Sequence, residues 1–262
     1  MIAGTLLAAL SLATAAGNIA WYRPKMTSNH ATLRPRREQA AMVLALLLAA
    51  AAFALQPGVI GYVAGGLAVI PAFLFLLGTA TSGLPDQRLA VAVGDMAPDF
   101  TATDSDGKKF RLSALRGSPV LLKFYRGYWC PYCVAELAQL NRFAEDFAGL
   151  GVKLVALSSD RVDELAPFGR KHRWKIALLA DPKLAVHRLY NVQYRKFAAR
   201  RGPFRDLAIP TTILLDKDGR VLWVEKSPDF RVRPQADVVL AKARALLPDA
   251  ATDAGSCNLC TA

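Results

Sequence analysis

The sequence has few cysteines, few histidines and a shortage of acidic side chains. Its 262 residues include four Cys, three His and 21 Asp and Glu against 33 Lys and Arg, a net charge of +12. Four cysteines are too few for a disulfide-stapled secreted scaffold of this length. His30, His172 and His187 show neither metal-ligand spacing nor a cysteine partner, so we expect them at the surface and predict no metal site. With 53% hydrophobic residues and a mean hydropathy of +0.23, the chain is also too apolar to be disordered.

Two long segments contain no charged residue at all. One runs from Ile2 to Tyr22 and the other from Gln39 to Pro85, and Gln56-Pro57-Gly58 interrupts the second. Pro57 removes a backbone donor and Gly58 allows a turn, which is typical of a helical hairpin. Helices of this length cross a hydrocarbon core. The sequence therefore predicts a membrane anchor over residues 1–85 with about three spans, at 2–22, 40–56 and 59–79.

The charges around the first segment predict its orientation. The small residues 13–17 would also suit a cleaved signal peptide, but the run lacks a basic start. Basic residues follow the run instead, opposed by Glu38 alone: Arg23, Lys25, Arg34, Arg36 and Arg37. Short loops with such an excess stay on the cytoplasmic side. This predicts an external amino terminus and a cytoplasmic location for everything beyond residue 86, in a membrane that we expect to be the bacterial inner membrane.

Residues 86–248 alternate between β-prone and helical runs. The β-prone runs are 120–125, 152–158, 176–179, 211–215 and 221–225, and the helical runs are 130–148, 161–173, 183–190 and 233–247. Such alternation is typical of a single α/β domain. Asp218-Gly219 lies between two β-prone runs and predicts a hairpin.

The strongest chemical signal is Trp129-Cys130-Pro131-Tyr132-Cys133, which follows an apolar strand and opens a helical run. At a helix amino terminus, unpaired backbone donors and the helix dipole stabilise a thiolate. Pro131 suits the first turn because its missing N–H has no partner there. The pattern predicts a redox dithiol of Cys130 and Cys133.

Two other interpretations of these cysteines stay open. They could be buried structural cysteines, or half of a zinc site completed by Cys257 and Cys260. The latter pair lies in a small, polar tail, residues 249–262, which we expect to be flexible. There it could form a second dithiol that exchanges electrons with the first, or two unremarkable exposed thiols.

Several motifs in the right order resemble those of a known family. Over about residues 91–247 the chain is similar to thioredoxin-fold redoxins, in the branch shared by peroxiredoxins of the alkyl hydroperoxide reductase and thiol-specific antioxidant type and by membrane-anchored thioredoxin-like proteins. The matching segments are 93–100, 124–130, 157–160, 179–182 and 209–212. The resemblance implies a thioredoxin-like fold, with a central sheet flanked by helices and an N-terminal extension, and thiol redox chemistry with no cofactor beyond the dithiol. Tethered relatives often face the other compartment, so a periplasmic domain is the alternative location.

The chain departs from both patterns within this family. Where peroxiredoxins carry a proline and a threonine before the attacking cysteine, it has Arg126 and Cys130, and where they carry an arginine it has Pro210. In thioredoxins the Pro210 position is a cis proline lying against the dithiol. Thioredoxins also place a buried acid where this chain has Lys123, which would either lower a thiol pKa or point to solvent.

These residues predict a thiol-disulfide oxidoreductase. We expect Cys130 to attack a protein disulfide and Cys133 to release the mixed disulfide. Trp129 and Tyr132 would shape the surface around an exposed sulfur, and Pro210 would pair with the incoming chain. The alternatives are a thiol peroxidase, in which Cys133 attacks a hydroperoxide, Cys130 resolves it and Arg126 supplies positive charge, and a non-enzymatic membrane redox sensor. Either enzyme needs a thiol electron donor that the sequence does not identify.

Residues 170–205 are strongly basic and contain Asp181 as their one acid. On a tethered domain this charge suits anionic lipid headgroups, each basic residue contributing about 1 kcal/mol near the surface. Nucleic acid is the rival partner, but no nucleic-acid-binding motif accompanies the charge. We therefore expect membrane lipid, and no nucleic acid, among the partners.

Overall fold

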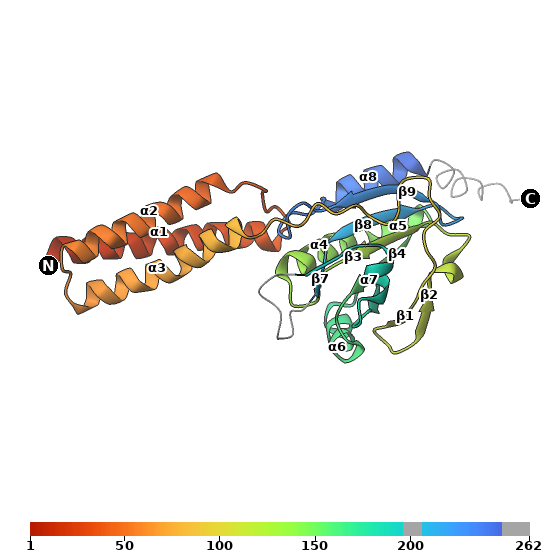
Figure 1. The fold of residues 1–262 in the computed structure, drawn as a ribbon, viewed down its shortest axis with the longest axis horizontal. Helices are drawn as coiled ribbons and strands as arrows, with labels where there is room; N and C mark the ends of the chain where they lie inside the picture. The colour runs from red at the N-terminus through yellow and green to blue at the C-terminus, as the bar shows by residue number, and fades with distance from the viewer. Residues whose placement is uncertain (196–205, 248–262) are drawn as a thin grey trace, which may run out of the picture. The chain divides into compact units, whose positions relative to one another are not determined.

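The structure, a computed structural model, describes residues 1–195 and 206–247. The chain divides into two compact units, the first covering Met1–Gly83 and the second beginning at Leu84 (Figure 1). The tail that contains Cys257 and Cys260 lies outside the described residues. So do residues 196–205 of the basic segment.

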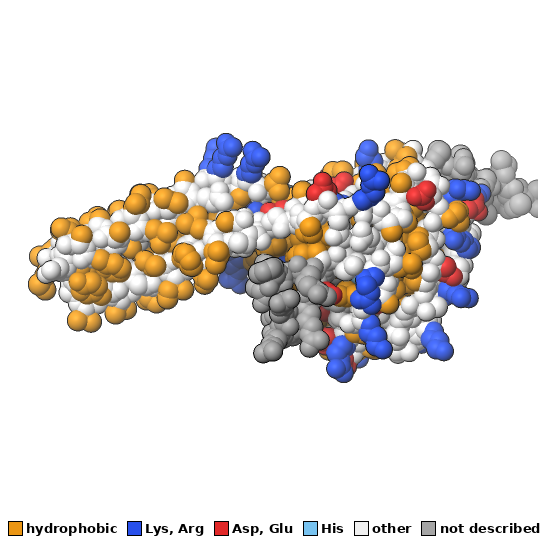
Figure 2. All heavy atoms as spheres, viewed as in Figure 1, with side chains coloured by type: hydrophobic (Ala, Val, Ile, Leu, Met, Phe, Trp, Pro, Cys, Tyr) orange, Lys and Arg blue, Asp and Glu red, His pale blue; other side chains and the backbone are white. Residues whose placement is uncertain are grey.

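The first unit consists of three helices: α1 (Ile2–Thr27), α2 (Arg36–Ala54) and α3 (Val59–Ala80). All three are long and apolar enough to cross a membrane. Large apolar side chains point outward from them, with Leu47 63% exposed and Ile70 61% exposed. Figure 2 shows hydrophobic side chains over the visible face of this unit. Such a surface suits lipid and not water.

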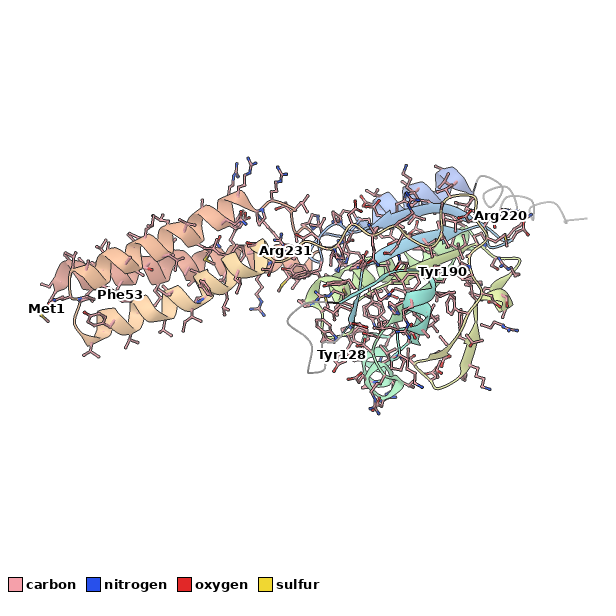
Figure 3. All side chains as sticks on the ribbon, viewed as in Figure 1. Met1, Phe53, Tyr128, Tyr190, Arg220 and Arg231 are labelled. Carbon is pink, nitrogen blue, oxygen red and sulfur yellow. The ribbon has the colours of Figure 1, made fainter. Side chains whose placement is uncertain are left out.

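Small residues bring the three helices close together. Ala45 is fully buried between helices, and its carbonyl oxygen accepts a 2.7 Å hydrogen bond from the hydroxyl of Ser11. A Cβ atom on Gly65 would lie 2.6 Å from the ring of Phe53, so only glycine leaves room for that ring (Figure 3). Close approach through small residues is how helices pack where no water drives their association.

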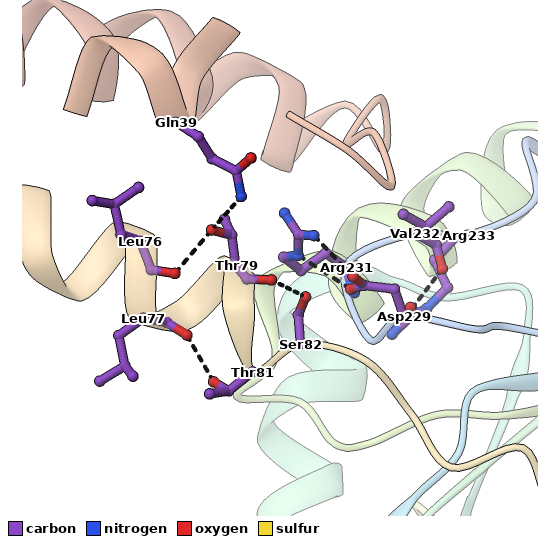
Figure 4. Close-up of polar contacts among 10 residues, drawn as sticks. All are labelled: Gln39, Leu76, Leu77, Thr79, Thr81, Ser82, Asp229, Arg231, Val232 and Arg233. Atoms are coloured by element: carbon purple, nitrogen blue, oxygen red, sulfur yellow. Dashed lines mark hydrogen bonds and ion pairs between the residues drawn. The ribbon is translucent and has the colours of Figure 1, made fainter. Parts of the chain in front are cut away.

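Polar side chains link the helices near the ends of α2 and α3. The Gln39 amide donates to the Thr79 hydroxyl at 3.0 Å (Figure 4). Glu38, expected as a lone acid among basic loop residues, is buried at the start of α2 and forms an ion pair with Lys25. These contacts pair groups that would be costly to bury without a partner.

The second unit is built on a seven-stranded mixed sheet in the order β2-β1-β5-β4-β3-β8-β9. Its strands β3, β4 and β5 are parallel to one another. β8 pairs antiparallel with β3, and β9 pairs antiparallel with β8 to complete one edge. A separate pair, β6 and β7, lies outside this sheet. The elements are β1 (Thr101–Asp104), β2 (Lys109–Arg111), η1 (Leu112–Leu115), β3 (Val120–Phe124), α4 (Pro131–Arg142), α5 (Ala144–Gly149), β4 (Lys153–Ser158), α6 (Val162–His172), β5 (Ala177–Ala180), α7 (Ala185–Leu189), β6 (Gln193–Arg195), β7 (Asp206–Ala208), β8 (Thr211–Leu215), β9 (Val221–Lys226) and α8 (Ala236–Leu246).

A hydrophobic core covers each face of this sheet. Side chains alternate along β3, so that Leu121 and Tyr125 join the core beneath α4, α5, α6 and α8, whereas Leu122 and Phe124 join the core beneath α7. The second core includes the fully buried Tyr190 (Figure 3). This arrangement confirms the prediction of an α/β domain.

Of two local predictions, the hairpin is confirmed and the long helix is divided into two. The Asp218-Gly219 hairpin is confirmed, since β8 and β9 pair across it and Gly219 adopts a φ of +81°. The helix expected over residues 130–148 breaks at Phe143 into α4 and α5.

The surface position expected for His187 is wrong. Its side chain is fully buried because α7 packs against the sheet, and the ring lies edge-on to Phe124 with 5.3 Å between centroids. Its Nδ1 atom lies 2.8 Å from a carboxylate oxygen of Asp181. Burial lowers the pKa of His187, so we assign it a structural role.

Candidate active site

The dithiol lies at the junction of β3 and α4. Cys130 is the N-cap of α4 and Pro131 is its first residue. The backbone N–H groups of Cys133 and Val134 both donate to the carbonyl oxygen of Cys130 at 3.0 Å. Gly127, with a φ of +150°, makes the turn, and a Cβ atom there would lie 2.4 Å from the indole nitrogen of Trp129. The turn thus requires glycine and brings both cysteines to the helix amino terminus.

Both cysteines are free thiols, and both are buried. Cys130 is 1% exposed and Cys133 is fully buried, and the two side chains are hydrogen-bonded to each other. The expectation of an exposed sulfur is therefore wrong, because both cysteines pack into the same core cluster as Tyr125 and Leu137. Trp129, beside them in sequence, is 42% exposed.

Three buried charged side chains lie beneath the dithiol. The Lys123 ammonium lies 2.5 Å from one carboxylate oxygen of Glu136, and the Arg233 guanidinium lies 3.0 Å from the other. Nη2 of Arg233 also donates to the sulfur of Cys133 at 3.3 Å. We call Lys123, Glu136 and Arg233 the buried triad, and it places two cations and one carboxylate against one thiol.

Each member of the buried triad comes from a different element. Lys123 lies on β3, on the same face as Leu121 and Tyr125, and its ammonium also donates to the hydroxyl of Thr212 on β8 at 3.0 Å. It is 1% exposed, so the alternative in which it points to solvent is wrong. Glu136 follows Cys133 by three residues on α4, which puts both on one side of the helix.

Arg233 comes from the segment that links β9 to α8. Its Nη1 atom donates to the carbonyl oxygens of Asp229 at 3.3 Å and of Val232 at 2.8 Å (Figure 4). Asp229 is in turn paired with Arg231 at 2.8 Å. These bonds hold the guanidinium in place before any reaction starts.

The two thiols differ in the direction of their pKa shifts. Burial by itself raises the pKa of Cys133, but the hydrogen bond from Cys130 and the charge of Arg233 together hold that pKa well below its usual value. The same hydrogen bond, followed by burial, raises the pKa of Cys130. With Cys133 ionised, its charge and that of Glu136 balance those of Lys123 and Arg233. The reduced site is therefore best described as a Cys133 thiolate that accepts a hydrogen bond from the Cys130 thiol.

Arg126 lies beside the dithiol among aromatic rings. It is 7% exposed, and its guanidinium carbon lies 5.1 Å from the Trp129 ring centre and 4.5 Å from that of Phe230. Tyr132 packs edge-on against Phe230, with 6.1 Å between ring centroids. The positive charge of Arg126 opposes the rise in the pKa of Cys130 that the hydrogen bond with Cys133 and burial cause, while its backbone N–H is bonded to Cys133.

Asp160 supports the loop that leads into the dithiol. Its Oδ2 atom accepts 2.8 Å hydrogen bonds from the backbone N–H of Tyr128 and from the hydroxyl of Ser158. Burial raises the pKa of Asp160 to about 6. A buried carboxyl group near a thiolate can exchange a proton in the physiological range.

Pro210 is buried immediately before β8, but its expected cis geometry is wrong. Among the described residues no peptide bond is cis, so the Ile209–Pro210 bond is trans. The backbone on both sides is already paired in this form: Ile209 N–H donates to Val192 at 2.7 Å, and the Pro210 carbonyl accepts from Ser227 at 3.0 Å. Trans is also the lower-energy state of an X–Pro bond.

Three residues of the site were missed from the sequence. Glu136 could have been found from its helical spacing to Cys133, and Asp160 from its place after a predicted strand. Arg233 gave no local signal, because it follows Cys133 by 100 positions. Only the fold brings the two together.

The described residues contain no group of three His, Cys, Asp or Glu side chains that could hold a metal ion. The zinc alternative needed Cys257 and Cys260, which lie outside the described residues.

Comparison with known proteins finds relatives of the second unit. A model of the AhpC/TSA family matches residues 93–224. The thiol-disulfide oxidoreductase ResA of Bacillus cereus (strain ZK / E33L) is 31% identical over 165 residues, covering 63% of this chain and 86% of that protein. Peroxiredoxin Bcp of Escherichia coli (strain K12) is 29% identical over 147 residues, covering 56% of this chain and 92% of that protein.

Solved structures agree as well. Peroxidoxin BcpB from Mycobacterium tuberculosis superposes with a TM-score of 0.50 at 30% identity, covering 59% of this chain and 97% of that one. The thioredoxin-like fold is therefore confirmed. Because the relatives are thiol-disulfide oxidoreductases and peroxiredoxins, the prediction of a thiol-based oxidoreductase is confirmed too. The chain belongs to the AhpC/TSA family.

Proposed function

We propose that this protein is a membrane-anchored thiol-disulfide oxidoreductase in which Cys130 and Cys133 cycle between a dithiol and a disulfide. The observation that carries the proposal is the pair itself: two hydrogen-bonded thiols in the first turn of α4, one of them next to a buried guanidinium. Two cysteines three residues apart at a helix start can close a bridge across one turn.

The reaction uses the two thiols in sequence. Cys133, as thiolate, accepts the proton of Cys130, and the Cys130 thiolate attacks a sulfur of the substrate disulfide. The departing substrate thiolate takes the proton from Cys133. Cys133 then attacks the Cys130 sulfur, which releases the second substrate thiolate and leaves the protein bridge. The substrate gains two electrons and the dithiol loses two.

Hydroperoxide reduction is the second candidate, and Arg233 favours it. Peroxiredoxins use an arginine beside the attacking thiolate, and this chain has Pro210 at that position. Arg233 supplies a guanidinium next to Cys133 from another part of the fold, 3.3 Å from its sulfur. In that reaction Cys133 attacks one peroxide oxygen and becomes a sulfenic acid, and Cys130 resolves it with loss of water.

The anchor would hold this chemistry at a membrane surface. Three apolar helices could cross the bilayer, and the basic loop between α1 and α2 supports a cytoplasmic location for the second unit. Its basic segment would then face anionic lipid. Labelling of single-cysteine variants with an impermeant reagent tests the orientation: a cysteine placed in residues 28–35 should react only after the membrane is permeabilised.

The function is tested by turnover of the purified full-length protein in detergent. With dithiothreitol as donor, we expect catalysed reduction of insulin disulfides that is lost in both Cys130→Ser and Cys133→Ser. Unchanged turnover in Cys130→Ser would overturn the assignment of the attacking thiol. Hydrogen peroxide consumption that depends on Cys133 and outpaces disulfide reduction would favour the peroxidase. Stoichiometric oxidation without turnover would indicate a sensor.

A further inference from the structure

The buried triad has a charge that matches only one redox state of the dithiol. In the reduced protein the thiolate of Cys133 and the carboxylate of Glu136 balance Lys123 and Arg233. When Cys133 enters a disulfide its charge disappears, while the other three groups stay buried at 1%, 2% and 5% exposure for Lys123, Glu136 and Arg233. An uncompensated buried charge is costly, and a titratable group in such a site changes its protonation state instead.

We propose that Lys123 releases a proton each time the dithiol is oxidised and regains it on reduction, so that it acts as the proton carrier of the redox site. This inference rests on the proposed dithiol cycle. It assigns a role to a lysine that neither disulfide exchange nor peroxide reduction requires.

The chemistry of the triad leaves Lys123 as the group that responds. A guanidinium does not deprotonate in proteins, so Arg233 keeps its charge. Protonating Glu136 would make the excess positive charge larger. Burial and the neighbouring Arg233 lower the pKa of Lys123, whereas Glu136 and Cys133 raise it, so losing the Cys133 charge favours the neutral amine.

The surroundings of Lys123 suit both protonation states. The Thr212 hydroxyl, 3.0 Å from the Lys123 nitrogen on β8, can accept from an ammonium or donate to an amine. On α4 the facing groups are Glu136 and Cys133, and the segment before α8 contributes Arg233. β4, the other neighbour of β3, places Ala156 opposite Lys123 and adds no charge.

The overall reaction is balanced with this step included. Two electrons pass from the dithiol to the substrate disulfide. Cys133 is already a thiolate and has no proton to release, so one proton comes from Cys130 and the second from Lys123. Without the lysine step, oxidation would release a single proton.

Proton counting in the full-length protein tests this. In a background where Cys257 and Cys260 are Ala, the reduced protein in weak buffer is oxidised with dithiobis(nitrobenzoate), whose product thiols are ionised near neutral pH. Their absorbance counts electrons, and an indicator dye counts protons. We choose about pH 8, where Asp160 is already ionised because its pKa is about 6 and so contributes no proton.

The ultraviolet absorbance of the reduced protein must first show one thiolate per chain at that pH, and its absence would overturn the proposal. We then expect two electrons and two protons, and two electrons with one proton would also overturn it. No electrons released would instead contradict the dithiol cycle itself.

Variants identify the group. Lys123→Met, measured above the pKa of its own thiolate, should release one proton, whereas Lys153→Met, an exposed lysine on the neighbouring strand β4, should release two. If both variants release two, Lys123 is not the carrier.

If Lys123→Met does not fold, the reduction potential of the parent protein is measured instead, by equilibration with glutathione at several pH values. The potential of the protein couple, referred at each pH to the potential of the glutathione couple, should fall by about 59 mV per pH unit above the pKa of Cys133, and a fall of only about 30 mV per pH unit would refute the proposal.

Discussion

Replacing Arg233 should raise the pKa of the Cys133 thiol. Its guanidinium donates to the sulfur at 3.3 Å, and the side chain of Arg233 is fully buried. A hydrogen bond to a charged group contributes about 1.5–3 kcal/mol. Because 1.36 kcal/mol corresponds to one pKa unit, Arg233→Met should raise the pKa of Cys133 by about 1–2 units.

The assay is the ultraviolet absorbance of the thiolate as a function of pH. It is read in a background of Cys130→Ser with Ala at positions 257 and 260, so that one thiol contributes. Arg244→Met is the matched control, because Arg244 forms an ion pair with Asp146 at 3.0 Å where both side chains are about half exposed.

Glu136→Gln tests the sign of the argument. It removes the carboxylate that shares the two cations with Cys133, so the pKa of Cys133 should fall. A pKa that is the same in Arg233→Met as in its parent, or that rises in Glu136→Gln, would refute the electrostatic account of the site.

Further predictions concern pH, packing and the surface around the dithiol. The folded pKa of Asp160 is raised from 3.8 to about 6, so its contribution to stability is complete below about pH 4 and is lost as the pH rises through about 6. In Asp160→Asn the free energy of unfolding should no longer show that loss of about 3 kcal/mol, and the melting temperature should depend less on pH. A melting temperature with the same pH dependence as that of the parent protein would contradict the assignment. Leu137 is fully buried on α4, so Leu137→Ala should lower the free energy of unfolding by about 2–5 kcal/mol, as measured by thermal unfolding. The control Val238→Ala should change it little, because Val238 is half exposed. If a protein substrate docks against the exposed ring of Trp129, as we propose, Trp129→Ala should slow insulin reduction more than peroxide consumption. Equal slowing of both would argue against that role.

Local patterns in the sequence were enough to predict the α/β alternation, the hairpin at Asp218-Gly219 and the dithiol at a helix start. Each of these depends on neighbouring residues, which hydrophobic periodicity and turn preferences report directly. The break at Phe143 was missed because the helical pattern continues through it. His187 was misplaced because one polar residue on a short helix gives no sign of which face the helix buries.

The charged part of the site depends on tertiary structure. Lys123 had two interpretations from the sequence, and the alternation along β3 that puts it on the same side as Leu121 decides between them. Arg233 belongs to a connecting segment that carries no motif, so only the position of α8 against α4 shows what it contacts. The burial of Cys130 was likewise invisible, because the motif reports a helix start and not what covers it.

The most direct test of the account is to identify the bridge that forms on oxidation. The full-length protein is oxidised with a stoichiometric disulfide, the remaining thiols are alkylated, and the digested protein is analysed by mass spectrometry. We predict a bridge between Cys130 and Cys133, with Cys257 and Cys260 alkylated or joined to each other. A stable bridge from Cys130 or Cys133 to the tail as the main product, or no bridge at all, would contradict the account.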